Sequence, residues 1–410
     1  MNSEVFKILH TLRAAGFKAG IVGGAVRDSV LGRQPRDIDV LTTAPISFLK
    51  ENFKTVSVGE KYGILIIEGV EVVSCKDIYD NLADRDFTIN AMYEDENGLL
   101  DPFSGREHFI KGRLICVQDP RITYAADPIR MLRALRFSAE FNLGVELSHI
   151  NQQAAKIRNC AAERIGAEFC KAVKVGLDLD AFVDSGLAAE ILPELVDCIG
   201  SPQSPIHHPE GCVFTHTKIV YKNTAGQDLS VRMAALLHDI GKPLTMAVNN
   251  GKIQHIGHEF VGEEMASKIL QRLKVPGKLT TEVCWIVKNH MLHNFPQRRP
   301  AKQALLLENP LFEKLLLVHE ADCMGRYETG VRKIYETPRP KATITGKDLK
   351  NLGLTPGPFF GRILKDARSK ELDGVPKEKV LKEISDGTLN GTCGNTPCSG
   401  DAQRTSASSD

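Results

Sequence analysis

A pair of glycines, Gly23-Gly24, separates a predicted strand at residues 18–22 from a predicted helix at residues 25–31. Glycines at such a turn let backbone N–H groups approach a phosphate closely, and a helix N-terminus favours negative charge. Asp37 and Asp39 follow on a second predicted strand, residues 37–41, where residues i and i+2 share a face. Two neighbouring carboxylates repel unless a cation lies between them, and Mg²⁺ binds carboxylates together with phosphate oxygens. The pattern therefore predicts a phosphate and Mg²⁺ site, although such an aspartate pair alone is also typical of a solvated strand end.

The apolar pattern predicts an α+β protein in five parts. Residues 1–145 mix helices with strands, two of them at residues 64–67 and 70–74, and form a small αβ head. Residues 146–200 are helical, and the turn-rich stretch 201–211 separates them from a histidine-rich, all-α domain at residues 201–335. A short helical module at 340–385 follows. Residues 386–410 have almost no apolar content and are predicted to be disordered.

Composition excludes several classes of protein. Hydrophobic residues make up 42% of the chain, which excludes a wholly disordered chain, and no apolar run approaches the ~18 residues of a membrane span. The N-terminus lacks the features of a signal peptide, and ten cysteines without CxxC pairs indicate reduced thiols. The sequence thus predicts a cytoplasmic protein with no membrane partner and indicates no obligate protein partner. Since 52 basic residues balance 51 acidic ones, any nucleic acid must bind to a local patch.

Four motifs follow one another over about 120 residues. They are GGAVRD at 23–28, DIDV at 37–40, RDFTINAM at 85–92 and DPIRMLRALRF at 127–137. In this order they resemble the nucleotidyltransferase head of the bacterial poly(A) polymerases and CCA-adding tRNA nucleotidyltransferases. The resemblance implies an enzyme that adds the 3′-terminal CCA to tRNA from CTP and ATP without a nucleic-acid template. A poly(A) polymerase, or a partial enzyme that adds only CC or only A, stays an alternative.

The resemblance also implies roles for individual residues. The proposed catalytic carboxylates are Asp37, Asp39 and Glu71, of which the first two would hold two Mg²⁺ ions. The proposed nucleotide-binding residues are Gly23, Gly24 and Arg27 for the triphosphate, Arg85, Asp86 and Asn90 for the ribose, Asp127 and Arg130 for the base, and Arg133 and Arg136 on the same basic helix face. The alternative for Asp127 is a helix cap before Pro128.

The sequence departs from the family pattern at two positions, because Asp84 replaces an arginine and Ala126 replaces a glutamate beside the base-reading pair. The residues beyond Lys382 lack the strongly basic extension expected of a bacterial poly(A) polymerase, which favours tRNA as substrate. Residues 341–382 carry ten basic and five acidic residues, a local excess of +5, and residues 297–302 form a second basic run. Both are candidate RNA-binding patches or ordinary solvated surface.

Histidines and aspartates form a second constellation in the helical part. The pattern resembles the HD phosphohydrolase superfamily, which implies a one-metal core extended by two further ligands: His216, His238, Asp239 and Asp322, then His258 and His290. Imidazole with carboxylate suits Mn²⁺, Ni²⁺, Co²⁺ or Fe²⁺. The domain would act as a phosphodiesterase or phosphatase, with Lys242 near a phosphate oxygen, or serve only as an RNA-binding body. In another alternative it is a 2′,3′-cyclic phosphodiesterase and the head only binds RNA. His255 and His293 have no counterpart in the pattern.

Overall fold

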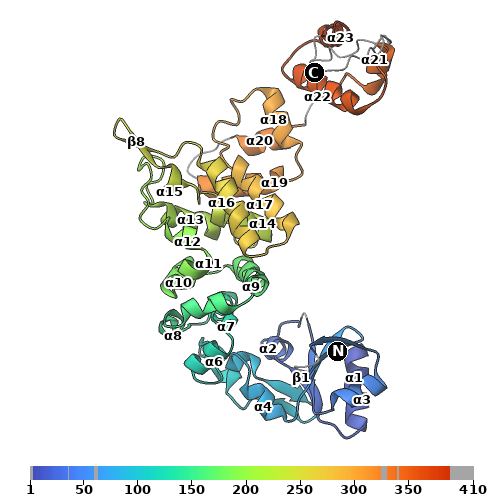
Figure 1. Ribbon diagram of the computed structural model, residues 1–410, viewed down its shortest axis with the longest axis vertical. Helices are drawn as coiled ribbons and strands as arrows, with labels where there is room; N and C mark the ends of the chain where they lie inside the picture. The colour runs from blue at the N-terminus through green and yellow to red at the C-terminus, as the bar shows by residue number, and fades with distance from the viewer. Residues whose placement is uncertain (1–2, 36, 60–62, 325–329, 339–340, 388–410) are drawn as a thin grey trace, which may run out of the picture. The chain divides into compact units, whose positions relative to one another are not determined.

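The computed structural model describes residues 3–35, 37–59, 63–324, 330–338 and 341–387 (Figure 1). The chain forms two compact units, residues 1–290 and 291–410. This division falls inside the part expected to be one histidine-rich domain, so the five-part organisation stays a prediction. The predicted disorder of residues 386–410 concerns residues that, from 388 onward, lie outside the described part of the chain.

The head is built on a seven-stranded mixed sheet in the order β3-β4-β5-β2-β1-β6-β7. The pair β2–β5 is parallel, and the other neighbours are antiparallel. The strands are β1 (Ala19–Val22), β2 (Asp39–Thr42), β3 (Thr55–Gly59), β4 (Ile64–Ile67), β5 (Val70–Ser74), β6 (Tyr93–Asp95) and β7 (Gly98–Leu100). The hairpin β4–β5 turns at Glu68-Gly69, where both residues have positive φ, as a two-residue type I′ connection requires.

Helices cover both faces of this sheet because its strands alternate their buried side chains. Leu9 and Leu12 of α1 and Leu49 of α3 pack with Val40 and Val72 on one face, and Figure 1 shows these two helices together. Ile78 and Leu82 of α4 pack with Leu41 on the other face. The helices of the head are α1 (Ser3–Ala14), α2 (Gly24–Val30), α3 (Ile46–Asn52), α4 (Ile78–Ala83), η2 (Thr88–Asn90), α5 (Gly105–Ile110), α6 (Pro120–Ala126) and α7 (Ile129–Phe141).

Helices dominate the rest of the first unit. They are α8 (Leu147–Asn151), η3 (Ala154–Asn159), α9 (Ala162–Val175), α10 (Leu179–Asp184), α11 (Leu187–Ile191), α12 (Pro193–Val196), α13 (Val213–Asn223), α14 (Leu229–Leu237), α15 (Lys242–Thr245), α16 (His258–Arg272) and α17 (Gly277–Asn289). The main-chain oxygen of Val173 on α9 accepts hydrogen bonds from Tyr221 (2.8 Å) and Arg232 (2.7 Å), which joins α9 to α13 and α14.

The expectation of an all-α histidine-rich domain is wrong in one detail. A hairpin of β8 (Ala247–Asn249) and β9 (Lys252–Gln254) lies between α15 and α16. Its turn residues, Asn250 and Gly251, both have positive φ, so an Asn-Gly turn of the usual hairpin type joins two three-residue strands. Strands this short give too little alternation to stand out from the helical sequence around them.

All the regular secondary structure among the described residues of the second unit is helical. It contains α18 (Pro300–Leu307), α19 (Phe312–Cys323), α20 (Val331–Glu336), α21 (Gly346–Asn351), α22 (Pro358–Leu372) and α23 (Lys377–Ser385). A small core of Ile344, Leu349, Ala367, Val380 and Ile384 holds the last three helices together. None of the helices in the described part of the chain combines the length and the apolar character needed to cross a bilayer.

Candidate functional site

The first candidate site forms where β1 ends and the glycine pair begins α2. Gly23 has φ +75°, and a Cβ atom there would lie 2.6 Å from Nη1 of Arg85, so the turn both needs the left-handed region and packs closely on that guanidinium. Val22, the last residue of β1, pairs with Asp39 on β2. This register brings the Gly23-Gly24 turn, which is of a type that binds phosphate, next to the predicted carboxylates.

The carboxylates gather at the same end of the sheet. Asp39 and Glu71 occupy partner positions on the parallel strands β2 and β5, whose spacing is about 4.8 Å. Burial, and then the charge of Asp37, raises the pKa of Asp39 against the opposing effect of Arg85. Partial burial, and then the charge of Asp39, raises the pKa of Glu71. Two neighbouring carboxylates whose ionised forms are disfavoured make a fitting place for a divalent cation.

The expected placement of Asp37 on the strand is wrong. The strand starts only at Asp39, opposite Val22, because β1 ends at that residue and offers no partner further along. Asp37 lies two residues before the strand, so strand alternation does not align it with Asp39. Both side chains nevertheless line the same cavity.

A chain of hydrogen bonds fixes the side chains predicted to contact the ribose. Asp86 accepts from the Asn90 amide (3.0 Å) and from both the Nε (2.8 Å) and Nη2 (2.7 Å) of Arg133. Arg27 donates to Oδ1 of Asn90 at 2.7 Å. Burial by itself would raise the pKa of Asp86, but the charge of Arg133 and these hydrogen bonds lower it below its ordinary value. Asp86 is therefore ionised and orients its neighbours.

The predicted base-reading pair has different partners in the structure. Asp127 accepts from Nη2 of Arg164 at 2.7 Å and, weakly, from the N–H of Ile129 at 3.4 Å. Arg130 donates to the main-chain oxygen of Asp84 at 2.7 Å. Sequence reasoning missed Arg164 on α9, because nothing in its local sequence shows that α9 packs against α7.

One cavity of about 920 Å³ collects these residues. Every predicted head residue except Gly23 lines it, and Gly23 adjoins it through Arg85. Arg33, Arg164 and Lys171 add positive charge that the sequence did not single out. Arg136 also lines the cavity, but its guanidinium forms ion pairs with Glu140 (2.8 Å) and Glu168 (2.5 Å), so it stabilises the contact between α7 and α9. Carboxylates at one end and guanidinium groups over the rest suit a bound nucleoside triphosphate and cations.

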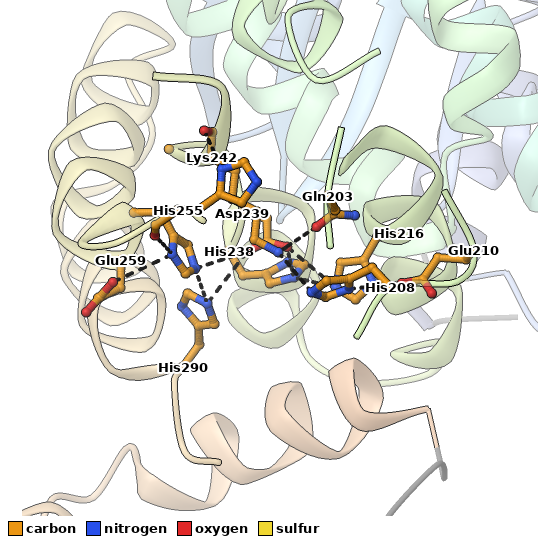
Figure 2. A network of polar contacts seen from close by, with 12 residues as sticks. Gln203, His208, Glu210, His216, His238, Asp239, Lys242, His255, Glu259 and His290 are labelled. Atoms are coloured by element: carbon orange, nitrogen blue, oxygen red, sulfur yellow. Dashed lines mark hydrogen bonds and ion pairs between the residues drawn. The ribbon is translucent and has the colours of Figure 1, made fainter. Parts of the chain in front are cut away.

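The second candidate site is a cluster of buried imidazoles around Asp239 (Figure 2). His216 lies on α13, His238 and His290 directly follow α14 and α17, and His258 begins α16. The Nε2 atoms of His216 and His238 are 3.3 Å apart, and those of His258 and His290 are 3.2 Å apart.

The Nδ1 atoms of this cluster explain how the imidazole rings are oriented. The Nδ1 atoms of His238, His258 and His290 face main-chain oxygens of Ala235 (2.9 Å), His255 (2.7 Å) and Val287 (2.7 Å). Each Nδ1 must donate there, so each ring, when neutral, presents the lone pair of its Nε2 toward the others. Two facing lone pairs at 3.2–3.3 Å repel unless a proton or a metal ion lies between them.

Asp239 reaches both imidazole pairs. Its Oδ2 lies 3.2 Å from His238 and its Oδ1 lies 3.3 Å from His258, so one carboxylate faces both positions. Lys242 contacts Oδ2 at 2.6 Å and Gln203 at 2.6 Å. Burial opposes ionisation, but His238 and Lys242 lower the pKa of Asp239 well below its ordinary value. The donor set fits two divalent cations that share a carboxylate.

Some residues of this site were missed, and one stays a prediction. Glu210 faces Nδ1 of His216 at 2.6 Å and of His208 at 3.1 Å, which extends the network into the stretch 201–211 expected to be a linker. The sequence His208-Pro209-Glu210 inside that stretch is the feature that could have indicated a role for Glu210. Asp322 lies on α19 in the second unit, and its role as a ligand stays a prediction.

Comparison with known proteins finds a family match in each of the two regions that carry these sites. The family "Poly A polymerase head domain" matches residues 19–69, and the family "HD domain" matches residues 213–325. The multifunctional CCA protein of Laribacter hongkongensis is 33% identical, over 75% of this chain and 85% of its own length. That of Halorhodospira halophila is 31% identical, over 87% of this chain and 96% of its own length.

Solved structures show the same fold. The CCA-adding enzyme of Bacillus stearothermophilus, solved with CTP, superimposes with a TM-score of 0.67 at 24% identity, over 95% of this chain and 99% of its own. The CCA-adding enzyme of Thermotoga maritima, solved with tRNA, superimposes with a TM-score of 0.61 at 18% identity, over 95% of this chain and 96% of its own. The extent of the match to the curated relatives carries the conclusion: the chain belongs to the family of multifunctional CCA proteins.

Proposed function

We propose that this chain adds the 3′-terminal CCA to tRNA, taking CTP and ATP as substrates and no nucleic-acid template. The observation that carries the proposal is the single cavity that gathers the carboxylates of two strands and the arginines of α2 and α7. The names of the relatives, and solved CCA-adding enzymes with CTP, ATP and tRNA, support it. A cytoplasmic location stays part of this proposal.

Asp37, Asp39 and Glu71 would hold Mg²⁺ at the carboxylate end of the cavity. The raised pKa values of Asp39 and Glu71 support this role, because a bound cation would offset both the burial and the carboxylate repulsion that raise them. When bound, Mg²⁺ would supply stabilisation of phosphate charge and a more acidic RNA 3′-hydroxyl. The carboxylates then fix where the hydroxyl and the triphosphate meet.

The remaining head residues would bind and orient the nucleotide. The Gly23 N–H donates to the main-chain oxygen of Met92 at 3.1 Å and fixes the turn. The Gly24 N–H at the start of α2 and the Arg27 guanidinium suit the triphosphate, and Asn90, held between Arg27 and Asp86, suits the ribose. Asp127 would accept from the base edge and Arg130 would donate to it, which allows selection without a template. Their bonds to Arg164 and to the Asp84 oxygen would hold the pair in position.

The test incubates the protein and Mg²⁺ with tRNA transcripts that end at the discriminator base, at C and at CC. Addition of two C and one A, followed by a stop, is the expected result. Unlimited addition of A would instead indicate a poly(A) polymerase, and A on the CC transcript alone a partial enzyme.

We also propose that the histidine cluster is a metal-dependent phosphohydrolase site. His216, His238, Asp239, His258, His290 and Asp322 would hold Mn²⁺, Ni²⁺, Co²⁺ or Fe²⁺. The facing Nε2 pairs on either side of Asp239 support this proposal. Hydrolysis of a chromogenic phosphodiester that survives Asp37→Ala and is lost in Asp239→Ala is expected. Loss in Asp37→Ala instead would contradict an independent second site.

A further inference from the structure

Three ligand-type side chains that neither proposed activity uses meet in the second unit. They are His293, which precedes α18, and His319 and Cys323 on α19. His319 and Cys323 are four residues apart in the helix, so they lie one above the other on one face. The donor atoms of all three residues lie within 4.8 Å of one another.

The spacing of this cluster fits a tetrahedral metal site. A zinc ion with Zn–S near 2.3 Å and Zn–N near 2.05 Å at tetrahedral angles places sulfur and nitrogen about 3.6 Å apart. The Sγ of Cys323 lies 3.6 Å from Nε2 of His319. The rings of His293 and His319 have centroids 5.5 Å apart and an interplanar angle of 63°, so they meet edge to face and are not stacked.

Burial separates this cluster from ordinary surface histidines. His319 is 1% exposed and Cys323 is 6% exposed, whereas His293 is partly exposed and leaves access from its side. A thiolate with two imidazoles is a softer donor set than the imidazole–carboxylate cluster around Asp239, and such a set selects zinc over magnesium or calcium.

We propose that His293, His319 and Cys323 form a third metal site, which binds Zn²⁺ through one thiolate and two imidazoles with a water molecule as the fourth ligand. The ion would join the segment that follows α17 to α19. Zn²⁺ that binds only the folded chain raises the stability of that unit by mass action. This ligand set differs from that of the proposed phosphohydrolase cluster, which includes no cysteine.

Cobalt titration of the full-length, metal-stripped chain tests the site, because a thiolate bound to Co²⁺ gives a charge-transfer band in the near ultraviolet and imidazole or carboxylate ligands do not. The expected result is a band whose final intensity corresponds to one thiolate-bound Co²⁺ per chain, even where the imidazole cluster also takes up Co²⁺, and which disappears when Zn²⁺ is added. No band at Co²⁺ concentrations that fill the imidazole cluster would overturn the proposal and leave Cys323 and His319 as a hydrogen-bonded pair.

Matched variants identify the ligand. Cys323→Ser and His293→Gln should lose the band, whereas Cys170→Ser should keep it, since Cys170 on α9 belongs to no group of metal-type ligands among the described residues. His293 is partly exposed, so its variant tests the site even if Cys323→Ser fails to fold. Zn²⁺ should also protect Cys323 from alkylation, read by peptide mass spectrometry. A band that persists in Cys323→Ser, or alkylation that ignores Zn²⁺, would contradict the assignment.

Discussion

Replacing Asp86 by asparagine probes the network that orients the nucleotide cavity. Asp86→Asn keeps an oxygen that can accept from the Phe87 N–H (2.8 Å) and the Asn90 amide (3.0 Å). It places an NH₂ group where Oδ2 now accepts from Arg133 at 2.7–2.8 Å. Two donors then face each other, and the ion pair is lost.

The burial of the Asp86–Arg133 ion pair sets the free-energy cost of losing it. Breaking a buried ion pair costs about 3–5 kcal/mol, but the Arg133 side chain is 33% exposed and water can solvate it in the variant. We therefore expect a local loss of about 2 kcal/mol, which corresponds to roughly thirtyfold faster opening.

The acid dependence has a defined sign. The pKa of Asp86 is lower in the folded state than its ordinary value of about 3.9. Its contribution to stability is therefore complete above that pH and is lost as the pH falls through the lowered pKa. Asp86→Asn should remove this part of the acid sensitivity.

Amide hydrogen exchange of peptides covering residues 85–92 measures the effect locally. The single tryptophan, Trp285, lies on α17 and does not report on the head. Asp119→Asn is the matched control, because Asp119 makes a similar two-point pair with Arg121 that is exposed to water. In this variant the amide exchange of residues 85–92 should stay unchanged. If Asp86→Asn has the same amide exchange and the same nucleotide KM as the unchanged protein, the Asp86–Arg133 pair does not hold this part of the cavity in place.

Three further predictions follow from packing, from the base-reading pair and from metal content. Gly166→Ala should destabilise the first unit by about 2–3 kcal/mol, because the new Cβ would lie 1.8 Å from the Leu273 oxygen. Gly277→Ala is the control, because a Cβ there meets open space, and calorimetry compares the unfolding of the two variants. Arg164→Ala should relax selection between CTP and ATP, because it frees Asp127, and competition assays measure this. Chelation should abolish both activities, with Mg²⁺ restoring nucleotide addition and a transition metal restoring phosphodiester hydrolysis; restoration of both by Mg²⁺ would contradict two metal sites of different chemistry.

The sequence predicted the local elements of the head well, because periodicity and glycine turns are local signals. The strands at residues 64–67 and 70–74 have the predicted bounds, and the glycine pair joins β1 to α2 as expected. Contacts between distant segments could not be read in the same way. The pairing of Asp127 with Arg164 depends on how α7 and α9 pack, and the approach of Glu210 to His216 depends on a loop without periodicity.

The most direct test of the central claim compares nucleotide addition by the unchanged protein and by Asp39→Asn on tRNA transcripts that end at the discriminator base, with labelled CTP and ATP. Asp39→Asn preserves shape and removes one charge from the carboxylate group. We predict addition of CCA by the unchanged protein and a loss of at least about a hundredfold in the variant, with phosphodiester hydrolysis intact. Addition of CCA at an undiminished rate by Asp39→Asn would contradict it.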